Sequence, residues 1–240
     1  MKLNRVGEKY LTKEGYEIKI IEYFNSSNCT IEFDNGVVFK NIQHCNIKNG
    51  AIKNPYHPSV LGRGYFGIGN YGSKTHNKIY YTWNAMLSRC YSERYQEKYP
   101  TYKDVTVYEE WYNFQNFAKW FEENYKEDFQ LDKDILQKGN KIYSPETCCF
   151  VPQEINILLT KSKGTIDNLP MGISKHGNKF QAQITMNGNL VYLGAFDTIE
   201  EAFIVYKTAK EEYIKEIASR YKNQITRHVY QALINYEIEK

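Results

Sequence analysis

Apolar and polar residues alternate most regularly in the run KFQAQITM, which spans residues 179–186. The apolar positions are Phe180, Ala182, Ile184 and Met186. The polar positions between them are Lys179, Gln181, Gln183 and Thr185. Because successive side chains of a strand point to opposite faces of a sheet, the run predicts a strand with one buried face and one solvated face.

Two shorter apolar runs flank this strand, MGIS on its amino side and LVYLGAF on its carboxyl side. Gly177-Asn178 and Asn187-Gly188-Asn189 separate the three runs and are typical of hairpin turns. Thr198 and Glu201 then have the spacing of a capping box, which predicts a helix running to about Ala218. We therefore expect a three-stranded antiparallel sheet with one helix packed across it, and Ser174 and Tyr192 on the solvated face.

Residues 1–53 show several short alternating runs with a hairpin signal at Asp34-Asn35-Gly36. This spacing predicts a small SH3-like β-barrel. Residues 54–78 are rich in glycine and predict a linker, in which Arg63 and Lys74 are candidates for contact with a nucleic-acid phosphate. The fold class expected for the whole chain is α+β.

Residues 79–91 and 108–125 predict helices, and residues 223–240 predict a helical tail. The second helix has apolar residues at helical spacing: Trp111, Phe114, Phe117, Ala118 and Phe121. Because they form a single stripe, we expect these side chains in the core and not as stacking platforms for bases.

Charge and cysteine content narrow the functional classes. Basic residues outnumber acidic ones in residues 1–80 and 161–240, and acidic residues outnumber basic ones in residues 81–160. Basic flanks suit contacts with phosphates, and an acidic centre suits a metal site. No apolar run approaches the ~20 residues that span a bilayer, so no membrane partner is expected. Five cysteines without a CxxC pair indicate buried thiols in a reducing cytoplasm.

The solvated face of the predicted sheet has the chemistry for reading DNA. Glutamine can bond adenine in a bidentate manner, and lysine and tyrosine can reach phosphates. The candidate DNA-binding residues here are Ser174, Lys175, Lys179, Gln181, Gln183, Thr185 and Tyr192. A small antiparallel sheet also fits the major groove, which is ~12 Å wide.

The sequence motifs PMGIS, KFQAQI and LVYLGAFDTIEEAFIVY, within residues 170–220, resemble the AP2 (integrase-type) DNA-binding domain. The resemblance implies that residues 168–222 dock a sheet in the major groove of double-stranded DNA. Plant members of that family have arginine and tryptophan on the base-reading face, where this chain has glutamines and a threonine.

Residues 79–162 are similar to the central module of phage and mobile-element HNH homing endonucleases that carry an AP2 domain. The similarity rests on TWNAMLSRCY, EEWYNFQNFAKWF, LDKDI, GNKIYSPETC and FVPQEIN. It implies a ββα module that binds one Mg²⁺ or Mn²⁺ ion, in a protein of a bacterial host's cytoplasm. Mapped residue by residue, the resemblance implies Asp132 and Asn156 as metal ligands, with Asp134 as an additional carboxylate.

Two of the three signature positions differ from the family pattern. Lys133 stands where these enzymes place the base histidine, and Thr147 stands where they place an asparagine. A lysine with an ordinary pKa is a poor base at neutral pH. Asp132 and Asp134 can share a metal only if the strand bends between them.

Three functions remain open on the sequence. The first is a double-stranded DNA-binding protein on an HNH-like scaffold without cleavage. The second is an active metal-dependent endonuclease that uses Asp132, Asp134 and Asn156, with Lys133 against the phosphate and His76 as a conceivable substitute base. The third is a protein-interaction module with a regulatory or counter-defence role.

Overall fold

The computed structural model describes residues 4–159 and 169–239. The chain divides into two compact units: residues 1–103 with 107–119, and residues 104–106 with 120–240. The division falls inside residues 79–162, the range predicted as one central module. Within the described residues both units mix helices with antiparallel strand pairs, as expected for an α+β protein.

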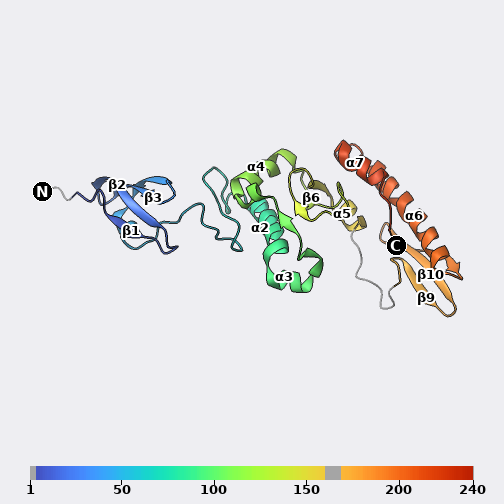
Figure 1. The fold of residues 1–240 in the computed structure, drawn as a ribbon. Helices are drawn as coiled ribbons and strands as arrows, with labels where there is room; N and C mark the ends of the chain where they lie inside the picture. Colours follow the sequence, from blue (N-terminus) through green and yellow to red (C-terminus); the bar gives the residue numbers. More distant parts are fainter. Residues whose placement is uncertain (1–3, 160–168, 240) are drawn as a thin grey trace. The chain divides into compact units, whose positions relative to one another are not determined.

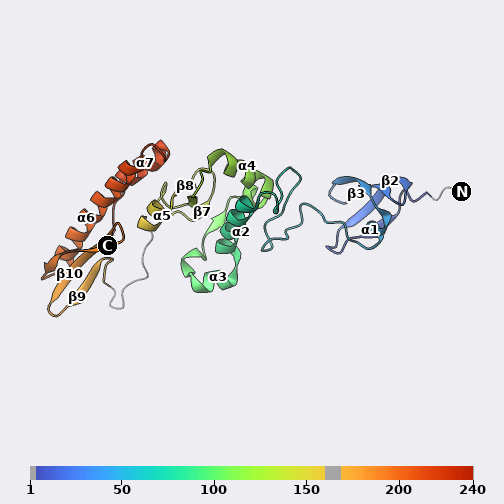
Figure 2. The same cartoon turned by 180° about the vertical axis from the view of Figure 1, so that it is seen from behind.

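The first unit begins with a four-stranded antiparallel sheet in the order β1-β2-β3-β4 (Figures 1 and 2). The elements are β1 (Lys9–Leu11), β2 (Glu17–Asn25), β3 (Asn28–Phe33), β4 (Val38–Ile42) and α1 (His44–Lys48). Its core consists of Ile18, Ile20, Cys29, Ile31, Phe33 and Ile47. In the described residues β1 and β4 each pair with one neighbour only, so the sheet is open and the predicted closure into a barrel is not observed.

Helices make up most of the rest of this unit. They are α2 (Asn77–Tyr91), α3 (Glu93–Lys98), the 3₁₀ turns η1 (Pro100–Tyr102) and η2 (Glu109–Tyr112), and α4 (Phe114–Asn124), which crosses the boundary between the units. The helix predicted over 108–125 is therefore interrupted at Asn113, whose side-chain oxygen accepts the Gln115 amide and caps α4. The predicted stripe from Trp111 to Phe121 is buried as core, and Trp83 Nε1 donates to the Trp111 carbonyl at 2.6 Å.

The glycine-rich segment is hydrogen-bonded to this helical core and does not have the independence expected of a linker. The Tyr65 amide donates to the Tyr112 carbonyl, and the Phe114 amide donates to the Tyr65 carbonyl, both at 2.9 Å. Gln115 Nε2 donates to the carbonyls of Phe66 and Tyr71. Glycine permits this close approach, since a Cβ at position 64 would collide with the side chains of Trp83 and Leu87 on α2.

The second unit starts with a small ββα arrangement. β6 (Phe129–Asp132) pairs antiparallel with β8 (Cys149–Pro152), and α5 (Gln153–Leu159) follows directly. β7 (Ile142–Tyr143) lies in the loop between them and pairs with β5 (Thr106–Val107). All four residues of β8 are buried, which explains why its sequence is apolar throughout and does not alternate.

The C-terminal part forms the predicted sheet and helix. Strands β9 (Ile173–His176), β10 (Lys179–Met186) and β11 (Asn189–Phe196) pair in the order β11-β10-β9, and α6 (Ile199–Arg220) packs across them. Asn187 and Gly188 form the turn between β10 and β11 with φ of 49° and 78°, the conformation that Asn-Gly favours. The predicted helical tail contains α7 (Arg227–Ile234), which packs against α6.

One apolar core joins the ββα part to the C-terminal part. It includes Val151 and Ile155 from the first, Ala182 and Tyr206 from the second, and Val229 from α7. Polar contacts at the surface also join α5 to the end of α6, because Glu154 accepts hydrogen bonds from Arg220 at 2.9 Å and from the Tyr221 hydroxyl at 2.8 Å.

The capping box at the start of α6 generates a stability prediction. Thr198 Oγ1 accepts the Glu201 amide, and Glu201 Oε2 accepts the Thr198 amide, each at 3.2 Å. We expect Thr198→Ala to lower the local opening free energy of the first turn of α6 by about 1 kcal/mol. Hydrogen exchange of the α6 amides measures this change.

Thr208→Ala is the matched control, because Thr208 is an exposed mid-helix residue whose hydroxyl donates to the Ile204 carbonyl. It should leave these amides unchanged or slightly more protected, since alanine has the higher helix propensity. Equal loss of protection in the two variants would contradict the cap.

Candidate functional site

The face of the C-terminal sheet opposite α6 is the first candidate site. Directly paired residues of antiparallel strands share a face, and Gln181 pairs with Ser174 and Ala195 while Gln183 pairs with Tyr192. We call this the outer face, and its residues are Ser174, His176, Lys179, Gln181, Gln183, Thr185, Leu190, Tyr192 and Ala195. The predicted alternation in β10 is confirmed, since Ala182 and Ile184 are buried and Phe180 and Met186 pack against the core.

The outer face is polar and free of carboxylates. None of its residues is acidic, and its one lysine, Lys179, has an ion-pair partner in Asp197 beyond the end of β11. Both partners of that pair are more than half exposed, so the pair contributes little and can open. Gln183 Nε2 donates a long 3.4 Å hydrogen bond to Ser174 Oγ, which leaves most of the amide's bonding capacity available.

Two apolar side chains stand out on this face. Leu190 is 68% exposed and Tyr192 is 60% exposed. Sequence reasoning placed Tyr192 here but missed Leu190 and His176. A register shift between Ala182 and Gln183 changes the pairing along β11, and only the observed register puts Leu190 opposite Thr185.

Three other predicted DNA-binding residues lie elsewhere. Lys175 pairs with Phe180, so its side chain belongs to the α6 side of the sheet. Arg63 and Lys74 are exposed residues of the first unit, and the Arg63 guanidinium lies 5.7 Å from the centre of the Tyr91 ring. His76 also belongs to that unit, and its Nδ1 accepts the Gly72 amide.

The loop after β6 is the second candidate site, and Lys133 lies at its centre. Its side chain is only 8% exposed, and Nζ donates to Asp134 Oδ1 and to the Asn140 carbonyl, both at 2.7 Å. The Asn140 side chain in turn donates to the carbonyls of Lys133 and Ile142. The loop therefore closes around the ammonium group of Lys133, which satisfies polar groups that would otherwise be buried without partners.

Asp132 has a structural role in the same loop. Its Oδ1 accepts the amides of Asp134 and Ile135 at 2.7 and 2.8 Å, which bends the chain directly after β6. Burial raises the pKa of this carboxyl above its ordinary value, although the two amide hydrogen bonds act in the opposite direction. Thr147 Oγ1 donates to the Ile142 carbonyl at 2.9 Å and fixes the far side of the loop.

The predicted metal ligands are partly engaged by bonds within the fold. Asp132 and Asp134 do lie at a bend, but one carboxylate oxygen bonds backbone amides and the other carboxylate pairs with Lys133. Asn156 Nδ2 donates to Gln130 Oε1 at 2.7 Å on the neighbouring strand. In the part of the chain that the structure describes, no three His, Cys, Asp or Glu side chains are grouped to hold a metal. A buried ammonium beside both carboxylates also opposes a second cation.

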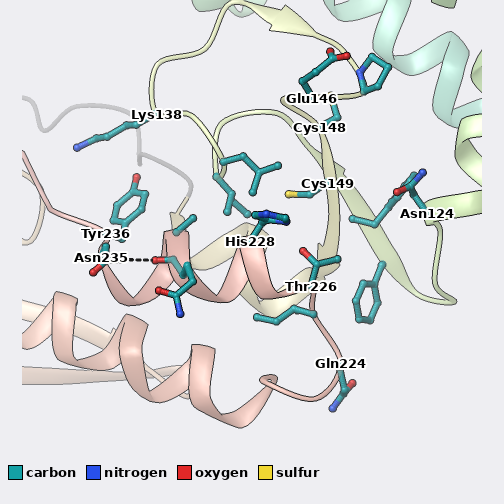
Figure 3. A pocket seen from close by; sticks show the side chains of 18 of the residues that line it. Asn124, Lys138, Glu146, Cys148, Cys149, Gln224, Thr226, His228, Asn235 and Tyr236 are labelled. Atoms are coloured by element: carbon teal, nitrogen blue, oxygen red, sulfur yellow. Dashed lines mark hydrogen bonds between the residues drawn. The ribbon is translucent and has the colours of Figure 1, made fainter.

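A cavity of about 900 Å³ lies between the ββα part and α7. Cys149 and His228 point into it, and Cys148, Tyr236 and Lys138 also line it (Figure 3). Burial raises the pKa of Cys148 to about 12 and also raises the pKa of Cys149. Both thiols are therefore protonated at neutral pH, and protonated thiols are weak nucleophiles and weak metal ligands.

Comparison with known proteins gives no family assignment. No protein-family model matches the chain, and no curated protein and no solved structure matches it significantly. Among the described residues no helix combines the length and the apolar character needed to cross a membrane. The site geometry is therefore the basis for a functional proposal.

The closed loop predicts a large difference between two substitutions at adjacent positions. We expect Lys133→Met to lower the unfolding free energy by about 1–3 kcal/mol, because the buried Asn140 carbonyl loses its donor. Asp134→Asn should cost less than about 1 kcal/mol, because Asp134 is 51% exposed and its ion pair is solvated on one side. Urea denaturation of the two variants beside the wild type provides the comparison.

The opposite order, with Asp134→Asn more damaging than Lys133→Met, would contradict a structural role for the buried ammonium.

Proposed function

We propose that the chain is a double-stranded DNA-binding protein whose outer face enters the major groove, and that it binds without cutting. The observation that carries the proposal is the composition of the outer face: two glutamines, a lysine, hydroxyl groups and two exposed apolar side chains, with no carboxylate. A carboxylate would repel the phosphates, and its absence along a whole solvated sheet face favours a polyanionic partner.

The dimensions of the sheet support this docking. Neighbouring strands lie ~4.8 Å apart, so the three strand axes span ~10 Å and match a major groove ~12 Å wide. Gln181 and Gln183 lie on the central strand, β10, and are half-buried between their neighbours. Their amides are therefore held near the middle of the face, where they can reach the N6 and N7 edge of adenine.

The remaining outer-face residues have complementary roles in the proposal. Leu190 and the Tyr192 ring offer apolar surface to thymine methyl groups, and the Tyr192 hydroxyl, Lys179 and Ser174 offer bonds to phosphates. Lys179 would exchange Asp197 for a phosphate, because the surface ion pair between them costs little to open.

The bonds within the loop after β6 are the reason that we propose binding without cleavage. Hydrolysis of a phosphodiester with a divalent ion needs free ligand oxygens and a base or metal-bound hydroxide near the phosphate. Asp132 Oδ1 and Asp134 Oδ1 are engaged by the fold, and Lys133 stands where the resembled enzymes have the base histidine. The ββα part then serves as a scaffold that anchors α6 and α7 through the shared core.

One prediction from this proposal concerns base recognition. A preferred duplex is first recovered by selection from a random pool. The double variant Gln181→Ala, Gln183→Ala should then lose, for each adenine contact removed, about 1–3 kcal/mol of the binding free energy that distinguishes this duplex from unrelated ones. Its binding to unrelated duplexes should change little, because phosphate contacts are intact. Fluorescence anisotropy on both duplexes measures the two affinities.

The matched control is Gln231→Ala, an exposed glutamine on α7 away from the sheet. It should bind both duplexes like the wild type. If no duplex binds at all, a protein-interaction module becomes the better account of the outer face.

The second prediction concerns cleavage. Supercoiled plasmid and selected duplexes incubated with Mg²⁺ or Mn²⁺ should remain intact, while the same mixtures show a mobility shift. Cuts that need the metal, disappear in EDTA and disappear in Asp132→Ala would contradict the proposal and establish the endonuclease alternative with Asp132 as a ligand.

A further inference from the structure

A cavity of about 360 Å³ opens at the β9 edge of the C-terminal sheet. β9 pairs with β10 only from Lys179 to Ala182, so the last residues of β10 have no partner strand on that side among the described residues. The cavity lies at this unpaired edge. Its polar lining comes from Ser174, Gln183, Thr185 and Lys210.

Lys210 is a partly buried lysine for which the described residues offer no hydrogen-bond or ion-pair partner. It lies on the side of α6 that faces the sheet, between Tyr206 and Tyr213 at helical spacing, and it is partly buried. No hydrogen bond or ion pair joins its ammonium to any described residue. The carboxylate of Glu211, the next residue, is engaged by Lys207 and by the Ile238 amide.

The environment of Lys210 makes a free ammonium costly. Burial lowers the pKa of Lys210 below its ordinary value. A buried cation without a counter-charge is destabilising, and it becomes favourable when an anion enters the same space. The other residues of the cavity supply donors of the right kind, namely two hydroxyl groups and a side-chain amide.

Three of the polar lining residues, Ser174, Gln183 and Thr185, are also outer-face residues. The cavity is therefore lined in part by the face on which DNA is proposed to lie, and Lys210 lines the same cavity from α6. We propose that the edge cavity binds a phosphate group, with Lys210 as its cationic ligand and Ser174 and Thr185 as hydroxyl donors.

The phosphate can belong to the DNA backbone or to a free nucleotide, and the two sources are separable. Assignment to the backbone rests on the proposed DNA binding, whereas a site for free phosphate does not. The test uses the full chain and compares Lys210→Met with Lys215→Met. Lys215 is an exposed lysine on the same helix, so its substitution removes the same charge from the surface.

With duplex DNA, Lys210→Met should weaken binding about tenfold and lower the slope of log K against log salt concentration by about 0.9, the value for one phosphate contact. Lys215→Met should change neither quantity measurably. In the absence of ligand, Lys210→Met should melt at a higher temperature than the wild type, because it removes a partly buried charge that pairs with no described residue. A misfolded variant would melt lower, so the melt separates loss of a ligand from loss of fold.

With inorganic phosphate or a deoxynucleoside monophosphate, at ionic strength matched with chloride, the wild type should melt at a higher temperature and Lys210→Met should not respond. Response to free phosphate without any DNA binding would keep the phosphate site and overturn the DNA-binding proposal. DNA binding with an unchanged salt slope in Lys210→Met, and no stabilisation of the wild type by phosphate, would overturn the site and leave DNA binding intact.

Discussion

The packing of α6 against one face of β10 is the constraint on which the C-terminal half depends. Ala182 and Ile184 are buried under the helix, and strand geometry then places Gln181 and Gln183 on the opposite side. A slip of one residue would expose the apolar set and bury two amides without partners, which costs several kcal/mol. The identity of the outer face is thus fixed by hydrophobic burial, and its polar chemistry is available for a ligand.

A second constraint acts in the loop after β6. The buried ammonium of Lys133 holds the Asp134 carboxylate and the Asn140 carbonyl, and Asp132 holds two backbone amides. These bonds use the groups that the resemblance to HNH endonucleases assigns to catalysis and metal binding. A divalent ion at this loop would have to share the two carboxylates with these bonds. The observed bonds therefore give Asp132, Lys133 and Asp134 a structural role in the loop.

The local sequence pattern is sufficient to predict the elements whose interacting residues are close together in the sequence. The alternation in β10, the Asn187-Gly188 turn and the capping box of Thr198 and Glu201 were all predicted and are observed. Each depends on periodicity or on side chains within three residues of one another. The aromatic stripe of α4 was likewise assigned to the core from its spacing, and it is buried.

Features that depend on distant partners could not be predicted in this way. The sequence predicts an independent glycine-rich segment because the partners of that segment, Tyr112 to Gln115, lie 44–49 residues further along the chain. Whether the N-terminal strands form an open sheet or a closed barrel depends on whether the two edge strands pair, and local sequence pattern does not determine this pairing. Lys133 could be recognised as a departure from the resembled family, but its burial and its bond to Asn140 required the fold. Lys210 gave no sequence signal, because a lysine on an amphipathic helix is usually solvated.

The most direct test of the account is to record amide chemical shifts of the isotopically labelled chain as a duplex is added. Docking through the outer face predicts perturbations concentrated in β9, β10 and β11, including Gln181, Gln183 and Leu190, with small effects in the loop from Asp132 to Asn140. Perturbations centred on that loop, or none in the sheet while DNA is bound, would contradict it.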